Sequence, residues 1–125
     1  KAACATELPK AFEKLAFSNG LEAWMQAVFA CNFYVDEQAP WALRKTDPER
    51  MRRVLATLSG CIRDLAIAIS PVTPTASGRI LDALCIPADK RDFAALAEDP
   101  ALCEIRVDNP TPVFPRLEMP AEEAA

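Results

Sequence analysis

Apolar side chains recur every three or four positions along two long stretches of this chain. From Leu21 to Val35, and again from Met51 to Ile69, that spacing places them on one face of a helix. Prolines bound both stretches, because Pro40 follows the first and the second lies between Pro48 and Pro71. The pattern predicts two long amphipathic helices, the second about six turns long.

Capping residues indicate where these helices begin. Ser18 is the expected N-cap of the first long helix. Two start signals overlap before the second: Asp47 as N-cap followed by Pro48, or Thr46 as N-cap with Glu49 three residues later in a capping box. Both interpretations begin the helix at the same place.

Shorter helices are predicted around these two, at residues 9–16, from Pro74 (capped by Thr73) to about 84, and at 89–97. Short loops between amphipathic helices favour antiparallel neighbours, so the predicted fold class is all-α, an antiparallel helical bundle. Residues 103–125 form a proline-rich tail, predicted to be an extended C-terminal strap on the bundle. Its expected contacts are Val113, Phe114 and Leu117, and the end after Pro120 is expected to fray.

Composition narrows the class of protein. A chain of 125 residues, 51% hydrophobic, suits one domain over 1–125, and no apolar run reaches the ~20 residues of a membrane span.

There is no histidine, the five cysteines include no CxxC pair, and the three glycines are far apart. These facts argue against a zinc site, a histidine-assisted nucleophile and a phosphate-binding glycine loop. We expect mostly buried, reduced thiols in a cytoplasmic protein without metal or cofactor. The sequence begins at Lys1, with neither a methionine nor the pattern of a secretion signal. We therefore also expect that the N-terminus was cut, trimmed or fused.

Charge is unevenly distributed along the chain. Its formal net charge is −4, yet the segment from Trp41 to Arg63 contains six basic residues and only two acidic ones. The six are Arg44, Lys45, Arg50, Arg52, Arg53 and Arg63. This local excess is either the solvated face of an exposed helix or a surface for a polyanion.

Trp41, directly after Pro40 at a break between helices, has two interpretations. It fills the core with its indole N–H satisfied, or it presents an aromatic face on which a base of single-stranded nucleic acid stacks. Asn32 lies on the apolar stripe of the preceding helix, so it either fastens the core near Pro40 or faces a ligand there. In an unknown protein, the structural interpretation of each residue is favoured.

Several motifs together resemble a known family. The segments "NFYVDEQAPWALRKTDPERM", "ISPVTPTASGRILDALCIP" and "PTPVFPRLEMP" are similar to the C-terminal anticodon-binding domain of bacterial methionyl-tRNA synthetase, from about Leu15 to Pro120. Its Asn-x-Tyr, Pro-Trp and Leu-x-Lys pattern is matched by a set of six residues. These are Asn32, Tyr34, Pro40, Trp41, Leu43 and Lys45.

The resemblance implies a helical bundle that grips the anticodon stem-loop of methionine tRNA. It assigns base stacking to Trp41 and the shape of the corner to Pro40. Phosphate contacts are expected from the basic face. Asn32 and Tyr34 are expected to support the structure of the loop. The basic face comprises Arg44, Lys45, Arg50, Arg52 and Arg53. The family's catalytic domain, with its HIGH-type and KMSKS-type signatures, is absent from these residues, so the chain is not expected to activate methionine.

One departure from the family motivates an alternative. The family's domain opens with a further helix whose asparagine and arginine contact anticodon bases, and nothing upstream of Lys10 resembles it. Its absence would leave apolar positions between Leu21 and Val35 uncovered, and Phe33 would enlarge that surface. The alternative function is therefore a stand-alone or engineered helical module that binds a protein partner or a second copy and no longer binds tRNA. A catalyst in its own right is disfavoured.

Overall fold

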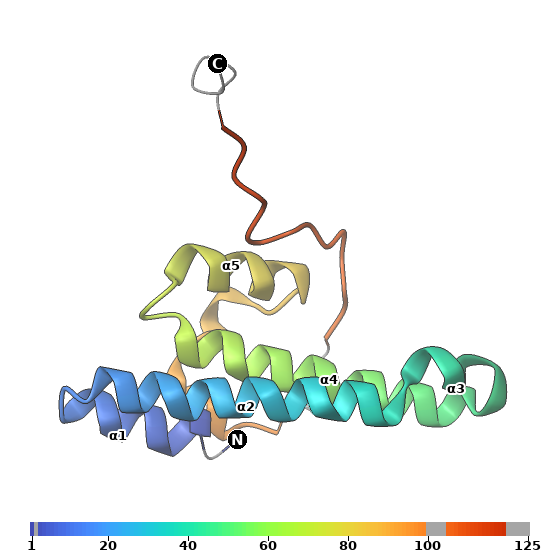
Figure 1. Ribbon diagram of the computed structural model, residues 1–125, viewed down its shortest axis with the longest axis horizontal. Coiled ribbons are helices and arrows are strands. Elements are labelled where there is room, and N and C mark those ends of the chain that lie inside the picture. Colours follow the sequence, from blue (N-terminus) through green and yellow to red (C-terminus); the bar gives the residue numbers. More distant parts are fainter. Residues whose placement is uncertain (2, 100–104, 120–125) are drawn as a thin grey trace.

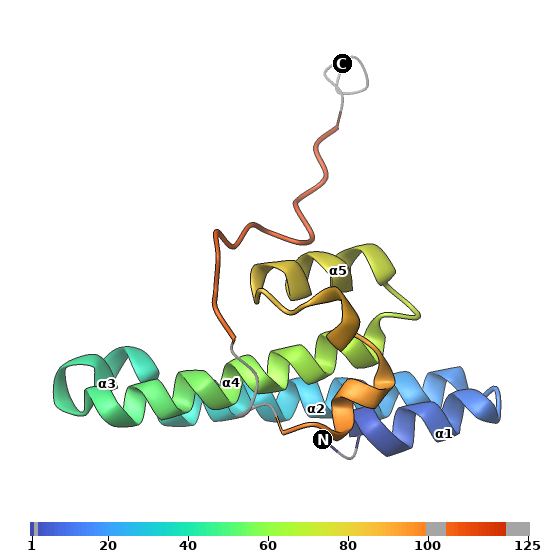
Figure 2. The same cartoon turned by 180° about the vertical axis from the view of Figure 1, so that it is seen from behind.

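The computed structural model describes residues 1, 3–99 and 105–119. Two long antiparallel helices, α2 (Phe17–Gln38) and α4 (Pro48–Ile69), lie side by side along the molecule (Figure 1). At one end α1 (Leu8–Glu13) folds back on α2, and at the other end α3 (Pro40–Thr46) joins α2 to α4. The fifth helix, α5 (Pro74–Ala83), packs on α4 on the side away from α1, as the reverse view also shows (Figure 2). The predicted all-α bundle is confirmed.

Three short turns complete the described helical elements: η1 (Ala3–Glu7), a π-helical turn, and the 3₁₀ turns η2 (Ala88–Lys90) and η3 (Phe93–Ala97). The single helix predicted over 89–97 is therefore wrong. Asp92 interrupts it, because its backbone is extended and its carboxylate accepts a hydrogen bond from the Ala95 amide at 3.0 Å. That contact starts a new turn instead of continuing the old one.

Prolines begin three of the helices, and two of these starts, at Pro48 and Pro74, were predicted. Pro40, Pro48 and Pro74 each lie in the first turn of their helix, where the missing amide proton costs nothing. Asp47 is the N-cap of α4, and its Oδ1 accepts a hydrogen bond from the Arg50 amide at 3.1 Å. This contact decides between the two overlapping start signals in favour of Asp47.

The start of α2 differs from the prediction. The helix begins at Phe17 with Ala16 as N-cap, so Ser18 lies inside the first turn. The Phe17 ring packs edge-on against the Phe12 ring of α1, with centroids 5.2 Å apart. This contact between neighbouring helices outweighs the local capping preference of serine.

Asp47→Ala is expected to lower the free energy of unfolding by about 1 kcal/mol, because the first turn of α4 loses its side-chain acceptor. Urea denaturation followed by circular dichroism measures this loss. Thr46→Ala is the matched control, since Thr46 Oγ1 donates to the Ala42 carbonyl within α3 and caps nothing. Equal losses in the two variants would contradict the role of Asp47.

The core lies at the C-terminal half of α4, where α5, η3 and η1 meet it. Its most buried side chains include Ile67, Leu81 and Leu96, with Cys4 contributed by η1. By contrast, the only buried residue of α2 is Gly20, whose backbone lies against the Phe12 ring. The helix α2 therefore covers the core with half-buried side chains.

The buried face of α4 is rotated relative to the predicted stripe. Val54, Leu58 and Ile69 are buried as expected, but Leu55 and Ile62 are 44% and 43% exposed. Five other side chains are buried instead. These are Arg63, Asp64, Ala66, Ile67 and Ala68. The reason is that α5 and η3 pack on that side of α4 and exclude water from it.

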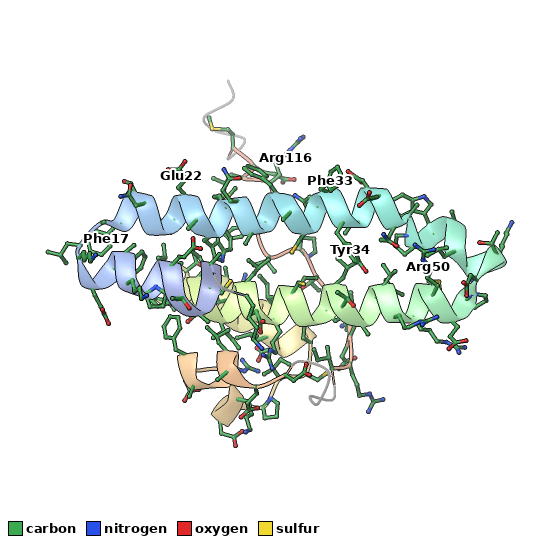
Figure 3. All side chains as sticks on the ribbon, turned by 90° about the horizontal axis from the view of Figure 1, so that it is seen from below. Phe17, Glu22, Phe33, Tyr34, Arg50 and Arg116 are labelled. Atoms are coloured by element: carbon green, nitrogen blue, oxygen red, sulfur yellow. The ribbon has the colours of Figure 1, made fainter. Side chains whose placement is uncertain are left out.

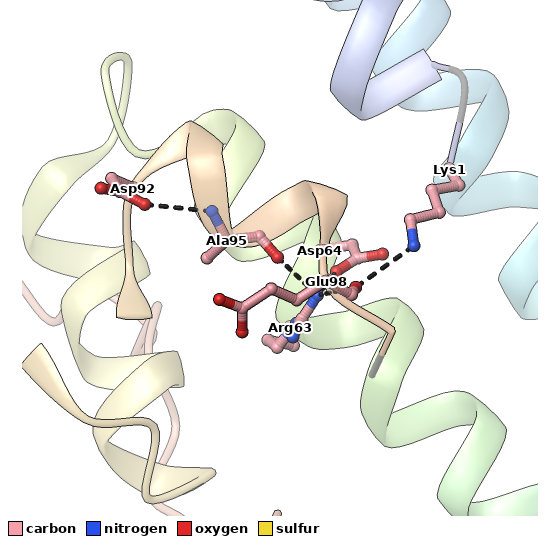
Figure 4. Close-up of polar contacts among 6 residues, drawn as sticks. All are labelled: Lys1, Arg63, Asp64, Asp92, Ala95 and Glu98. Atoms are coloured by element: carbon pink, nitrogen blue, oxygen red, sulfur yellow. Dashed lines mark hydrogen bonds and ion pairs between the residues drawn. The ribbon is translucent and has the colours of Figure 1, made fainter. Parts of the chain in front are cut away.

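A buried ion pair connects α4 to η3 (Figure 4). The Arg63 guanidinium is 1% exposed and donates to Asp64 Oδ1 from Nε at 3.0 Å and from Nη2 at 2.6 Å. Nη2 also donates to the backbone carbonyls of Ala95 at 3.2 Å and Glu98 at 3.4 Å. Arg63 is thus a core residue and does not belong to the predicted basic surface.

The tail is attached where it leaves the bundle. The Arg106 and Asp108 amides donate to the carbonyls of Leu84 and Ala83 at 3.3 and 2.9 Å. Further on, Phe114 lines an apolar groove of about 540 Å³ between α2, α4 and α5, but Leu117 is 94% exposed. The strap is therefore confirmed only in part, because Phe114 is itself 77% exposed and the predicted Leu117 contact is absent. Cys103 and residues 120–125 lie outside the described residues.

Candidate nucleic-acid interface

The corner between α2 and α4 is formed by a few consecutive residues. The helix α2 ends at Gln38, and Ala39 turns the chain with φ 42° and ψ 64°, a left-handed conformation that costs a non-glycine residue about 1 to 2 kcal/mol. Pro40 then begins α3 and is buried. The chain thus makes a sharp reversal, and its tip carries α3. Pro40 shapes the corner by its burial and its fixed φ.

Trp41 follows in the first turn of α3 and is 64% exposed. It therefore lies in a helix, whereas the sequence suggested a break between helices. The structural interpretation, an indole that fills the core, is also wrong. The burial of Pro40 directs the chain so that the next side chain faces outward. An aromatic face with this exposure is available to stack on a planar ligand.

Exposed cations surround this corner on α3 and on the first turns of α4. Arg44 and Lys45 lie in the last turn of α3, where positive charge also complements the helix dipole. Arg50, Arg52 and Arg53 lie near the start of α4, and all five side chains are exposed. We call these five residues the basic corner. Arg63 is excluded from it by burial.

Arg50 holds the corner together as well as contributing charge. Its Nη2 donates to Gln38 Oε1 at 2.9 Å, which connects the last turn of α2 to the first turn of α4. Figure 3 shows the Arg50 side chain in this position between the two helices. Sequence reasoning missed Gln38, although its place at the end of a helix before Pro40 was a usable signal.

Asn32 and Tyr34 do not share a face of α2. Asn32 is exposed, so the interpretation that it fastens the core is wrong, and an orientation toward a ligand stays a prediction. Tyr34 is half-buried and points toward α4, while Phe33 points away from the bundle (Figure 3). Tyr34 can therefore support the packing of α2 on α4. Phe29 and Phe33 are 55% and 68% exposed, so α2 does present apolar side chains to solvent.

The described part of the chain offers few other chemical features. It contains no group of three or more side chains suited to hold a metal ion. None of its helices combines the length and apolarity needed to cross a lipid bilayer. Of its four free cysteines Cys4 is buried, Cys31 and Cys61 are half-buried and Cys85 is exposed, so the expectation of mostly buried thiols is wrong.

The antiparallel bundle and its exposed corner define an all-helical domain. Residues 5–109 match the family described as "Anticodon binding domain of methionyl tRNA ligase". Because this match covers most of the chain, the chain belongs to that family.

Individual relatives agree with this assignment. The chain is 40% identical over 107 residues to the methionine–tRNA ligase of Brucella suis, covering 86% of the chain and 21% of the relative. It is 40% identical over 124 residues to that of Mesorhizobium japonicum, covering 98% and 24%. The apo crystal structure of Mycobacterium tuberculosis methionyl-tRNA synthetase superposes with a TM-score of 0.83 at 32% identity, covering 95% of this chain and 25% of the other.

The chain thus spans about a fifth to a quarter of the length of these relatives. Its residues correspond to the anticodon-binding part and not to the catalytic part of those ligases. The prediction that these residues exclude the catalytic domain is therefore confirmed. The interaction module that was the alternative is not favoured by these matches.

Proposed function

We propose that this chain binds the anticodon stem-loop of methionine tRNA as the anticodon-binding part of a methionyl-tRNA synthetase. Trp41 stacks on a base of the loop, and the basic corner holds the phosphates on either side. The observation that carries this proposal is the exposed indole of Trp41 at a corner surrounded by five exposed cations. Membership of the anticodon-binding family supports it.

The chemistry is non-covalent. Single-stranded loops offer unstacked bases, and a base stacked on an aromatic side chain contributes about 1 to 3 kcal/mol. Arginine and lysine neutralise phosphates and release the counterions bound to the RNA. No cofactor or metal is needed for either contribution.

Charge distribution also orients the RNA on the protein. The formal net charge of the whole chain is −4, although the segment of the basic corner carries a local excess of positive charge. The remainder is therefore strongly acidic and repels phosphate. An approaching stem-loop is directed to the corner, where Trp41 is presented.

The proposal predicts preferential, salt-sensitive binding. In a titration at two salt concentrations, the methionine anticodon stem-loop should bind more tightly than an unrelated stem-loop, and its affinity should fall as salt rises. Arg53→Ala should weaken binding and reduce the slope of log K against log salt by about 0.7 to 0.9 for each phosphate that the variant no longer neutralises. Fluorescence anisotropy of a labelled stem-loop measures both quantities.

Arg79→Ala is the matched control, because Arg79 is exposed on α5 and lies outside the basic corner. Its affinity and salt slope should equal those of the unmodified chain. If Arg79→Ala and Arg53→Ala reduce the slope equally, binding is non-specific attraction and the corner has no special role. Equal affinity for both stem-loops would contradict recognition of the anticodon.

A further inference from the structure

Two thiols face each other across the interface between the long helices. Cys31 lies on α2 and Cys61 on α4, and both line one cavity of about 650 Å³. Besides burial, the electrostatic and hydrogen-bonding effects of Cys61 are among the causes that raise the pKa of the Cys31 thiol, so the two side chains are neighbours. Both residues are half-buried, so the pair is neither sealed in the core nor fully exposed to solvent.

The surroundings of this pair allow the helices to approach closely. The same cavity is lined by Ala27 and Ala30 of α2 and by Ala56 and Gly60 of α4. A disulfide needs Cα atoms about 4.4 to 6.8 Å apart, a separation that facing residues reach where two helix axes pack roughly 8 to 10 Å apart. Small side chains on both helices remove the steric obstacle to that approach.

We propose that Cys31 and Cys61 form a reversible disulfide that links α2 to α4 when the chain meets a hydroperoxide. This inference is independent of tRNA binding. The cavity that the two thiols line gives a small oxidant such as hydrogen peroxide access to them. The link would fix the two helices between which α3 is held.

The reaction balances with hydrogen peroxide as the two-electron oxidant. One thiolate attacks a peroxide oxygen, so that an S–O bond forms, the O–O bond breaks and the departing hydroxide takes up a proton to become water. The second thiol loses its proton, and its sulfur attacks the sulfenic sulfur. The S–S bond forms as the S–O bond breaks, and a second water leaves. Both sulfurs are oxidised and the peroxide is reduced.

Reactivity at this pair is restrained at neutral pH. Burial, followed by the electrostatic effect and hydrogen bond of Cys61, raises the pKa of the Cys31 thiol. Burial also raises the pKa of Cys4, on the neighbouring turn η1, to about 11. Because the thiolate is the nucleophile, the disulfide should form more readily under mildly alkaline conditions. Cys4 lines the same cavity and is the competing partner.

The test is oxidation of the folded chain carrying Cys85→Ser and Cys103→Ser, treated with hydrogen peroxide at mildly alkaline pH. We expect the loss of two free thiols, a cross-linked Cys31–Cys61 peptide in a non-reducing digest by mass spectrometry, and reversal by dithiothreitol. Cys4→Ser added to this chain should retain the cross-link, whereas Cys31→Ser should abolish it. When the unfolded chain is oxidised in denaturant, the Cys31–Cys61 disulfide should no longer be the preferred product.

Two products within a single chain would overturn the proposal. One is a cross-link of Cys4 to either residue as the main product, which would mean that η1 provides the closer thiol. The other is sulfinic acid at Cys31 or Cys61 without a cross-link, because it would show that the helices do not approach closely enough. Size-exclusion chromatography after oxidation separates an internal disulfide, which leaves a monomer, from a link between two chains, which would also contradict the proposal.

Discussion

Replacement of Arg63 by methionine is expected to lower the free energy of unfolding by about 3 to 5 kcal/mol, a large share of the stability of a domain of this size. The variant keeps a long side chain but removes the charge. Asp64, whose side chain is 10% exposed, is then left as an uncompensated buried carboxylate. The carbonyls of Ala95 and Glu98 lose a donor as well.

Urea denaturation followed by circular dichroism measures this loss. Arg53→Met is the matched control, because it makes the same chemical change at an exposed position of α4 and should stay within about 0.5 kcal/mol of the parent. Adding Asp64→Leu to Arg63→Met should recover part of the stability, since the orphaned charge is removed. A loss in Arg63→Met no larger than in Arg53→Met would show that the ion pair does not stabilise the fold.

The contrast between these two arginines shows where sequence reasoning reached its limit. Both lie on one helix within a positively charged segment, so the sequence alone counted both in the same local excess of positive charge. What separates them is η3, which packs on α4 from the far end of the chain and covers Arg63. Long-range packing of this kind leaves no local signal, apart from Asp64 directly after Arg63 as a possible partner.

Local chemistry was sufficient for most of the helix boundaries. Pro48 and Pro74 each begin a helix as predicted, because the constraint on proline is contained in the residue itself. Pro40 was expected only to end the preceding helix, but it also begins α3. Ser18 failed as a cap because the packing of Phe17 on Phe12, a contact between two helices, decides where α2 begins. The constraint of proline therefore held, whereas the capping preference of serine gave way to a contact with a neighbouring helix.

The basic corner was predictable because its residues are close in sequence. Trp41 and the five cations are brought together by two helices and one sharp turn, so little of the site depends on distant parts of the chain. The exposure of Trp41 was not predictable from its own position, since for an indole after proline a core position was the favoured interpretation. The burial of Pro40 and the left-handed backbone conformation of Ala39 determine that the Trp41 side chain is exposed.

Trp41→Ala is expected to weaken binding of the methionine anticodon stem-loop by about 1 to 3 kcal/mol, roughly 5- to 150-fold. The stacking surface is removed, while the basic corner still attracts phosphate, so the salt slope should remain nearly unchanged. Because Trp41 is 64% exposed, its removal should cost little stability, and the fold should persist. Anisotropy titration of the labelled stem-loop measures the affinity.

Two further variants test whether the loss of affinity comes from the aromatic face of Trp41. Trp41→Phe should retain most of the affinity, since a phenyl ring still stacks. Trp24→Phe changes the other tryptophan, whose Nε1 donates to the Leu65 carbonyl at 3.0 Å inside the bundle. It should lower stability by about 1 kcal/mol, because this hydrogen bond is removed, and leave affinity unchanged. Unchanged affinity in Trp41→Ala would exclude stacking at this position and leave the basic corner as the only source of RNA binding.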